Sequence, residues 1–308
     1  MPFFSVIIPL YNKESFIANT LKSVLNQSFT DFEVIIVNDG STDASEFQVQ
    51  QFEDSRIRYY LRENKGVSAA RNLGITMANS DYITFLDADD YWYPNFLQTM
   101  HANIIRFPNE KVFTAAIEIE TTRNIVPATY AIAKTGLVEI VDFFKASTKE
   151  SVICTSAAAF HKSVFEKSGG FDTTMRSGED TDLWIRIGLD FKVVFDWKIL
   201  ARYVYDEVSL GKNPNYNNEK LNFDKFLTIE QTNPDIKKYL DLNRYSLAIK
   251  SKLNDNSASF KKFKNAINLQ NLTLKRKILL HLPRPTLKML LLVNQFLANN
   301  GLGNSVFR

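Results

Sequence analysis

Strand-like and helix-like segments alternate along the first hundred residues of the chain. The predicted order is a strand over 3–10, a helix over 15–26, strands over 32–38 and 56–61, a helix over 68–77 with Ser68 as its N-cap, and a strand over 82–86. Such alternation predicts an α/β protein whose parallel sheet is covered by helices on both faces. Ligands of these sheets bind beyond the carboxyl ends of the strands. Polar clusters follow three of those ends, at 11–13, 38–43 and 87–90.

The size and composition of the chain fit one large core with an appendage. Its 308 residues are 45% hydrophobic and 13% aromatic. The single cysteine, Cys154, excludes an internal disulfide framework and a multi-cysteine metal site, which is typical of a reducing compartment. A strand begins at once, without a basic leader, so we expect no secretion signal and a cytoplasmic protein. The apolar run 289–293 is far shorter than the roughly 20 residues of a membrane span.

Charge divides the chain into two parts. Residues 235–308 carry 14 Lys or Arg against 3 Asp or Glu, whereas residues 1–234 carry 23 against 31. We therefore predict a catalytic α/β domain over 1–212 and a helical, basic extension over 213–308, with the junction near "GKNPNYNN". The basic tail is either a solvated helical face or a surface for nucleic acid, anionic lipid or an acidic partner.

The second part of the α/β region, 111–212, is predicted to be mixed. Its expected elements are strands over 111–121 and 151–160, helices over 162–170 and about 180–189, and strands over 191–196 and 200–205. The chain shows no internal repeat and no low-complexity segment.

The stretch "TFLDADDYW", 84–92, crowds three carboxylates at the end of a buried-looking strand. Asp87, Asp89 and Asp90 repel one another unless a cation or a set of hydrogen-bond donors holds them. Alternate strand residues share a face, so Asp87 and Asp89 point to the same side. Hard divalent cations prefer such oxygen ligands, which predicts a metal site. For Asp90 a second-ligand role stays open beside the favoured one, a helix-capping acid before Pro94.

Four segments, in this order, resemble the glycosyltransferases of family 2, the inverting group built on the GT-A fold. They are "FSVIIPLYNKESFIANTLKSVLNQSFTDFEVIIVNDGSTD", "ENKGVSAARNLGI", "DYITFLDADDYW" and "GGFDTTMRSGEDTDLWIRI". The resemblance covers roughly residues 3–210. It implies a Rossmann-like, mostly parallel sheet with a nucleotide-binding half over 1–110 and an acceptor-binding half over 111–212.

The resemblance implies a nucleotide site at the strand ends. Asp39 would accept a hydrogen bond from uracil N3–H, Tyr11 would lie against the ring, and the predicted site also includes Pro9 and Asn64. Arg71, near the start of a helix, would lie by the nucleotide or its phosphates, since a helix N-terminus and a guanidinium both attract anions. The alternative for Asp39 is a local Asx turn. For Arg71, an ion pair with a strand-end acid is compatible with the nucleotide role.

The resemblance also implies the catalytic and metal residues. Asp89 would bind Mn²⁺ or Mg²⁺, and Asp87 would face the ribose or bound water. In the pair Glu179-Asp180, the aspartate would be the general base that deprotonates the acceptor hydroxyl. The alternative makes Asp180 a helix N-cap. Many family members carry a histidine after the last strand, but "ARYVYDEVSLGK" has none, so no third protein ligand is assigned.

The predicted function is transfer of a sugar from UDP-hexose or UDP-N-acetylhexosamine to a hydroxyl of a glycan or lipid-linked acceptor, in cell-surface polysaccharide synthesis. The alternative is a non-catalytic nucleotide-sugar-binding assembly subunit. A dinucleotide-dependent oxidoreductase is disfavoured because "PLYNKES" lacks G-x-G-x-x-G. No nucleic-acid partner is expected. The tail segment "KRKILLHLPRPTLKMLLLVNQFLANN" fits peripheral contact with an anionic inner membrane face, or packing on the domain, or a dimer contact.

Overall fold

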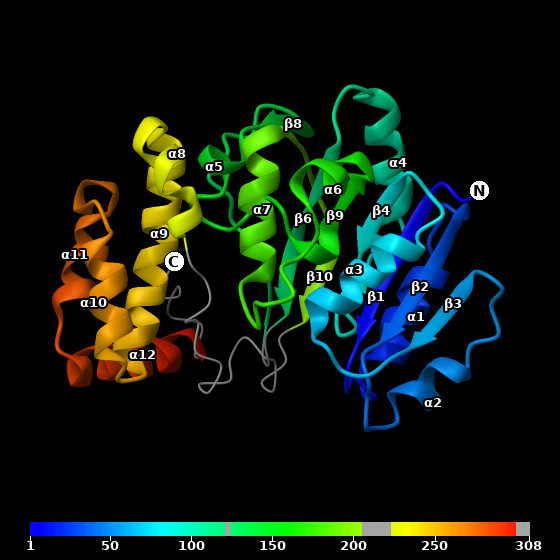
Figure 1. Ribbon diagram of the computed structural model, residues 1–308, viewed down its shortest axis with the longest axis horizontal. Helices are drawn as coiled ribbons and strands as arrows, with labels where there is room; N and C mark the ends of the chain where they lie inside the picture. The colour runs from blue at the N-terminus through cyan, green and yellow to red at the C-terminus, as the bar shows by residue number, and fades with distance from the viewer. Residues whose placement is uncertain (121–123, 205–222, 300–308) are drawn as a thin grey trace.

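The structure is a computed structural model that describes residues 1–120, 124–204 and 223–299, without the side chains of 294–299. Its described residues form one ten-stranded sheet in the order β3-β2-β1-β4-β9-β6-β10-β5, with β7 on β6 and β8 on β10. Helices cover the sheet, and further helices stand beside it (Figure 1). The predicted α/β class is correct.

The first half of the sheet is parallel, as the alternation predicts. β1 pairs with both β2 and β4, and β2 pairs with β3, all in parallel. These strands are β1 (Phe4–Leu10), β2 (Phe32–Asn38), β3 (Ile57–Leu61) and β4 (Tyr82–Phe85), and the helices between and after them are α1 (Ile17–Leu25), α2 (Ser45–Gln50), α3 (Val67–Met77) and α4 (Phe96–Arg106). β1 and β2 are buried along their whole length because helices lie on both faces.

The second half of the sheet is mixed rather than parallel. β9 (Ala158–His161) lies antiparallel between β4 and β6 (Val112–Glu120), and β10 (Val193–Val204) runs parallel to β6. The remaining elements are β5 (Tyr91–Trp92), β7 (Ile125–Pro127), β8 (Val138–Val141), α5 (Phe143–Ala146), the 3₁₀ turn η1 (Thr155–Ala157), α6 (Ser163–Ser168) and α7 (Glu179–Asp190).

Two strand predictions in this half are wrong in extent. The stretch 151–160 is a strand only from Ala158, because η1 occupies the three residues before it. The two strands predicted over 191–196 and 200–205 are the single strand β10. A register irregularity between Asp196 and Ile199 explains the error, since it interrupts the alternation without ending the strand.

Within 223–299, the part of the tail that the structure describes, five helices follow the sheet, as the sequence predicts for the basic tail. They are α8 (Leu227–Thr232), α9 (Pro234–Leu253), α10 (Ser257–Asn265), α11 (Leu274–His281) and α12 (Arg284–Asn299), with short 3₁₀ turns η4 (Asp224–Phe226) and η5 (Leu269–Asn271). α9 joins them to the sheet: the ring of Tyr239 lies 5.1 Å from that of Phe143 and 5.6 Å from that of Phe144 in α5. The predicted junction near 213 lies outside the described residues.

The apolar core is divided by the sheet into two clusters. Side chains of β1 alternate between them, with Ile7 in one and Val6 and Ile8 in the other. The Ile7 cluster continues without a break through α7 into α9, where it includes Tyr239 and Leu240. The helices of the tail are therefore part of the same core as the sheet.

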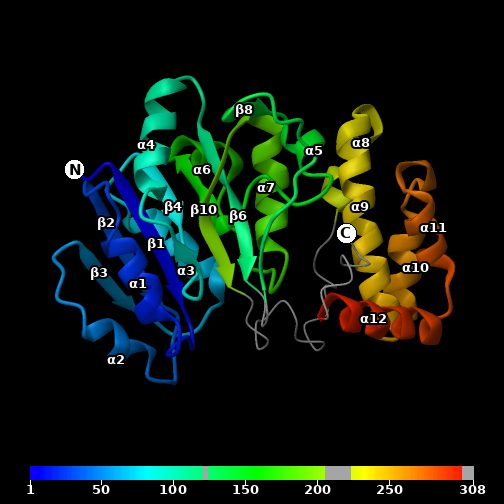
Figure 2. The ribbon, with the colours of Figure 1, turned by 180° about the vertical axis from the view of Figure 1, so that it is seen from behind.

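α12 lies at the end of the molecule toward which β1 and β6 run (Figures 1 and 2). That end also holds the loops that follow β1, β2 and β4. Among the residues that the structure describes, no helix combines the length and apolar character that crossing a bilayer requires.

Candidate active site

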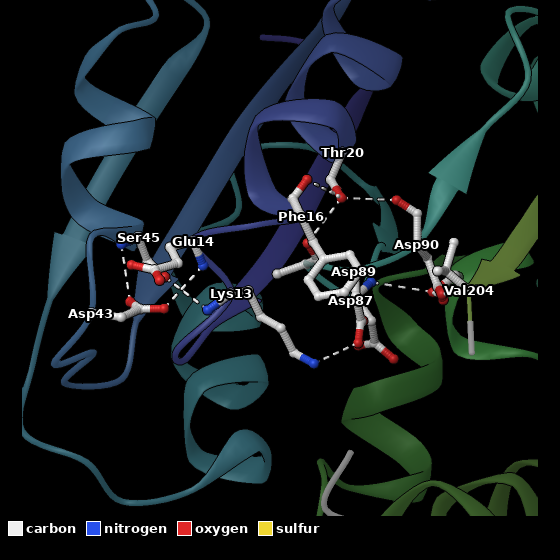
Figure 3. A network of polar contacts seen from close by, with 12 residues as sticks. Lys13, Glu14, Phe16, Thr20, Asp43, Ser45, Asp87, Asp89, Asp90 and Val204 are labelled. Carbon is white, nitrogen blue, oxygen red and sulfur yellow. Dashed lines mark hydrogen bonds and ion pairs between the residues drawn. The ribbon is translucent and has the colours of Figure 1, made fainter. Parts of the chain in front are cut away.

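Hydrogen bonds fix the loops after β1 and β2 against each other at the carboxyl edge of the sheet. The Lys13 amide donates to Ser45 Oγ at 2.8 Å, and the Glu14 amide donates to Asp43 Oδ2 at 3.0 Å (Figure 3). Asp43 also accepts from the Ser45 amide at 3.0 Å, so it holds a local turn as well as the neighbouring loop. The Lys13 backbone is thereby held in a defined position.

Asp39 holds the loop before α3. Its carboxylate accepts from the amides of Lys65 at 3.0 Å and Gly66 at 2.7 Å, and it pairs with Arg62 Nε at 3.3 Å. The alternative of a local Asx turn for Asp39 is therefore wrong, because its partners lie 26 and 27 residues further along the chain. The carboxylate connects the end of β2 to the start of α3.

The other predicted nucleotide residues lie at the same edge. Pro9 is buried near the end of β1, opposite Val37 of β2. Tyr11, which follows β1 directly, has an exposed side chain, as does Asn64 in the loop before α3. The structure thus brings together a buried strand end, an exposed ring and the Asp39 loop that the predicted site requires.

Gly66, not Ser68, stands at the N-cap of α3. Gly66 has a φ of 89°, a backbone conformation that favours glycine, and the helix begins at Val67. The predicted N-cap is wrong because Ser68 already lies inside the first turn, where its hydroxyl is buried and has no partner among the described residues.

Arg71 joins the two halves of the predicted site. Its guanidinium contacts Asp87 Oδ1 at 2.7 Å and Glu179 Oε1 at 3.0 Å, and it lies 5.1 Å from the centre of the Phe171 ring. The predicted ion pair with a strand-end acid is correct. Burial by itself would lower the pKa of Arg71, but the carboxylates of Asp87 and Glu179 outweigh it and raise the pKa. Arg71 is therefore a permanent buried cation between β4 and α7.

Asp89 faces a second cation, Lys13. Lys13 Nζ lies 2.7 Å from Asp89 Oδ2, and both side chains are largely buried (Figure 3). Burial and the neighbouring Asp87 raise the pKa of Asp89, while Lys13 opposes the increase. The crowded acids are thus held by two basic side chains, Arg71 on Asp87 and Lys13 on Asp89.

The donor set fits a divalent ion that arrives with a diphosphate. Asp87 and Asp89 offer hard carboxylate oxygens, but the described residues contain no group of three or more His, Cys, Asp or Glu that could hold a metal by itself. Mg²⁺ typically uses one or two carboxylates, completing its shell with waters and phosphate oxygens. Tyr205, Asp206 and Ser209, residues of "ARYVYDEVSLGK" that could replace the missing histidine, lie outside the described residues.

Asp90 has a structural role, and the predicted helix-capping role is wrong. Its carboxylate accepts from Ser156 Oγ at 2.5 Å and from the Val204 amide at 2.9 Å, tying β10 to the loop after β4. Asp90 lies too far before the helix to cap it, because α4 begins at Phe96, with Asn95 at its N-cap. Burial and the adjacent acids raise the pKa of Asp90 well above its usual range.

Glu179 and Asp180 open α7. Gly178 precedes them at the N-cap with a φ of 78°, in the left-handed region that favours glycine. Asp180 is not the N-cap, because it lies one residue inside the helix, where its Oδ1 accepts from the Thr181 amide at 2.5 Å. Burial raises the pKa of Glu179, and Arg71 opposes this. Trp184, further along α7, is buried in the core.

Sequence reasoning missed three contributors to the site. Lys13 belongs to the polar cluster after β1, but nothing in its spacing pointed to Asp89. Ser156, which bonds Asp90 and accepts from the Asp87 amide at 3.2 Å, lay inside a segment that resembled a strand. Phe171 packs against the Arg71 guanidinium, and a phenylalanine after two glycines carries no signal for such a contact.

Comparison with known proteins agrees with this arrangement. Residues 5–169 match the family model described as Glycosyl transferase family 2. The chain belongs to this family. An uncharacterized glycosyltransferase of Rickettsia bellii is 34% identical over 188 residues, covering 59% of this chain and 26% of that protein. Glycosyltransferase GlyA of Streptococcus pneumoniae is 39% identical over 105 residues, covering 33% and 15%. The chain thus spans about a quarter or less of the length of these two relatives.

Solved structures show the same fold. S. aureus TarS 1-349 in complex with UDP-GlcNAc aligns with a TM-score of 0.62 at 17% identity, covering 97% of this chain and 92% of that one. A second structure of S. aureus TarS aligns with a TM-score of 0.63 at 19% identity, covering 91% of this chain and 52% of that one. The family 2 chain described here therefore has the GT-A fold.

Proposed function

We propose that this family 2 glycosyltransferase moves a hexose or N-acetylhexosamine from a UDP-sugar to a hydroxyl of a glycan or lipid-linked acceptor, with inversion, in cell-surface polysaccharide synthesis. The observation that carries the proposal is the double ion pair of Arg71. It sets the acids after β4 beside the Glu179-Asp180 pair at the start of α7. Leaving-group and acceptor chemistry need those two groups of residues in one place.

Each residue then has a defined task. Asp180 accepts the acceptor proton as the hydroxyl attacks the anomeric carbon, a contribution typically worth ~10²–10⁴-fold in rate. Arg71 places permanent positive charge near the departing diphosphate. Asp89, with Asp87 beside it, would hold Mn²⁺ or Mg²⁺, which when bound neutralises charge on the diphosphate. Glu179 orients Arg71.

The donor would lie across the ends of β1 and β2. Asp39 would meet the uracil, Tyr11 the face of the ring, and Pro9 and Asn64 would complete the nucleotide-binding wall. TarS has been solved with UDP and with UDP-GlcNAc, and these complexes support a uridine donor for a chain of the same fold. We assign catalysis to residues 1–212, regard 213–308 as a helical extension, and place the protein in the cytoplasm.

A panel assay tests this function. The full chain is incubated with UDP-sugars and Mn²⁺ or Mg²⁺, with and without glycan or lipid-linked acceptors, and release of UDP is followed. We expect acceptor-dependent release that chelation of the metal abolishes. If nucleotide-sugar binds but no acceptor stimulates release, the protein is instead an assembly subunit that binds the donor.

Removing the base isolates its contribution. We expect Asp180→Asn to lower kcat by about 10²-fold or more, because an amide cannot accept the acceptor proton. Donor affinity should stay near that of the unaltered protein, since Asp180 is assigned to the acceptor. Measuring UDP-sugar binding by calorimetry beside turnover separates these effects. Turnover close to that of the unaltered enzyme would falsify the assignment of the base.

A further inference from the structure

Two adjoining helices expose large apolar side chains at helical spacing. On α11, Leu274 is 74% exposed and Ile278, four residues later, is 52% exposed. On α12, Met289, Leu292 and Val293 are 58%, 67% and 49% exposed. Spacings of three and four residues put each set on one face of its helix. We call these five side chains the α11–α12 surface.

Lysines flank the apolar residues on both helices. At about 100° per residue, Lys275 and Lys277 fall on opposite sides of the Leu274–Ile278 line, and Lys288 lies beside Met289. None of these three lysines forms an ion pair with a carboxylate in the part of the chain that the structure describes. Lys277 and Ile278 also line a shallow depression of about 390 Å³ at the C-terminal end of α11, together with His281, Leu282 and Pro283. Unpaired ammonium groups therefore border an exposed apolar strip.

We propose that the α11–α12 surface docks on a membrane surface rich in anionic phospholipid. The apolar side chains would enter the boundary between headgroups and acyl chains, and the lysines would pair with lipid phosphates. Charge argues against a second copy of the chain as the occupant. Residues 235–308 carry 14 basic against 3 acidic side chains, so a symmetric dimer would oppose like charges.

The position of α12 determines which end of the protein would face the membrane. α12 lies at the end of the molecule toward which β1 and β6 run, as both ribbon views show (Figures 1 and 2). A protein resting on α12 would bring the carboxyl edge of its sheet close to the bilayer. An acceptor with a lipid anchor would then reach the site, a consequence that rests on the proposed function, whereas lipid binding itself does not.

Vesicle flotation tests the proposal with the full-length chain. Vesicles of phosphatidylglycerol and phosphatidylcholine in equal parts are compared with phosphatidylcholine alone, without nucleotide. Two paired variants are used, Lys275→Gln with Lys277→Gln, and Met289→Gln with Leu292→Gln. The matched controls are Lys22→Gln on α1 and Ile105→Gln on α4, both at exposed positions of the same chemistry. Thermal melting and sedimentation accompany each sample.

We expect binding to the anionic vesicles only, weakened at about 0.5 M NaCl by screening. The lysine pair should lower the partition coefficient about 25-fold, since one lysine near such a surface contributes roughly fivefold. The apolar pair should lower it about tenfold or more, and the controls should leave it unchanged. Absence of vesicle binding, equal binding by all variants, or self-association that the apolar pair abolishes would each overturn the proposal.

Discussion

At the residue scale, the acid cluster after β4 contains its own counter-ions. Lys13 contacts Asp89 and Arg71 contacts Asp87, so two basic side chains from different elements balance the carboxylates. The two basic side chains differ in how easily each can leave its carboxylate. Arg71 is fixed between two acids and a phenylalanine ring, whereas Lys13 extends to Asp89 on a flexible stem. If Asp89 is a metal ligand, Lys13 competes with the metal ion for the Asp89 carboxylate.

Replacing Lys13 tests this competition. We expect Lys13→Met to increase the affinity for Mn²⁺ in the absence of nucleotide by roughly fivefold, the value of a partly exposed ion pair of about 1 kcal/mol. Electron paramagnetic resonance titration of free Mn²⁺ measures it without any assay of activity. Lys22→Met, at an exposed site on α1, serves as the control. Unchanged or weaker Mn²⁺ binding would contradict the competition.

The sequence predicted the neighbourhood of these residues better than their partners. Asp39 and Asp87 follow parallel strands, so their placement at one edge follows from topology alone. The partners depend on tertiary contacts instead. Nothing local indicates that Asp39 bonds two amides beyond β3, or that Asp90 reaches Val204 at the end of β10. The prediction of Ser68 as N-cap is wrong because the N-cap lies two residues earlier, at Gly66, and such a shift of a helix start changes which side chain can cap.

At the element scale, the end of the sheet away from the site is held by Glu33 of β2. Its carboxylate accepts from Ser5 Oγ at 2.6 Å and the Asn79 amide at 2.7 Å, and it pairs with Arg58 at 2.5 Å. One buried acid therefore links β1, β3 and the turn before β4. Although burial would raise the pKa of Glu33, these hydrogen bonds and Arg58 together lower it below 4.5.

Glu33→Gln should therefore destabilise the protein in a pH-dependent way. Because the folded pKa is lowered, the stabilisation is present above the unfolded value near 4.5 and is lost as pH falls through the folded value. We expect a loss of about 1–3 kcal/mol at pH 7, as for hydrogen bonds to a charged group. Urea unfolding at pH 7 and pH 3 measures it.

The exposed Glu53→Gln provides the control for that comparison. The difference between Glu33→Gln and the unaltered protein should shrink at pH 3, while Glu53→Gln stays neutral throughout. A destabilisation of Glu33→Gln that is equal at both pH values would mean that shape, not charge, makes the contribution.

Periodicity predicted the elements of the first half well and those of the second half less well. β1 and β2 are continuous apolar runs bounded by turn residues, so their limits are visible in the sequence. The sequence does not show that β10 is one continuous strand, because the irregularity between Asp196 and Ile199 shifts the alternation of apolar and polar residues within it. The order β4-β9-β6 also escapes prediction, since β9 inserts antiparallel between strands that precede it in the chain.

At the scale of the whole molecule, the tail helices and the sheet share one core. Tyr239 of α9 packs on Phe143 and Phe144, and Lys145 pairs with Asp235 at 3.5 Å. We therefore expect a single cooperative unfolding transition, not separate melting of the sheet and the tail. Charge composition separated the two regions in the sequence, but it describes surfaces and says nothing about a shared interior.

Tyr239→Ala tests this coupling. Removing a buried aromatic ring should cost about 3–5 kcal/mol and loosen α9 from α5. Hydrogen exchange should then rise first in α9–α12, while β1–β4 keep their protection. Phe47→Ala, at an exposed position of α2, is the control and should change neither. Equal loss of protection across the sheet and the tail would contradict this prediction, because it would show that the tail helices do not unfold locally without the sheet.

The shared guanidinium of Arg71 limits how the protein can be recombined with its relatives. A chimera that exchanges residues 111–204 to alter specificity imports a new opening turn of α7, while Arg71 stays with the recipient. Unless the donor sequence supplies a carboxylate where Glu179 stands, a buried cation loses one of its two anionic contacts. A chimera whose crossover point separates Arg71 from Glu179 therefore needs donor and recipient sequences that still supply both charges. This requirement favours the exchange of α3 and α7 together.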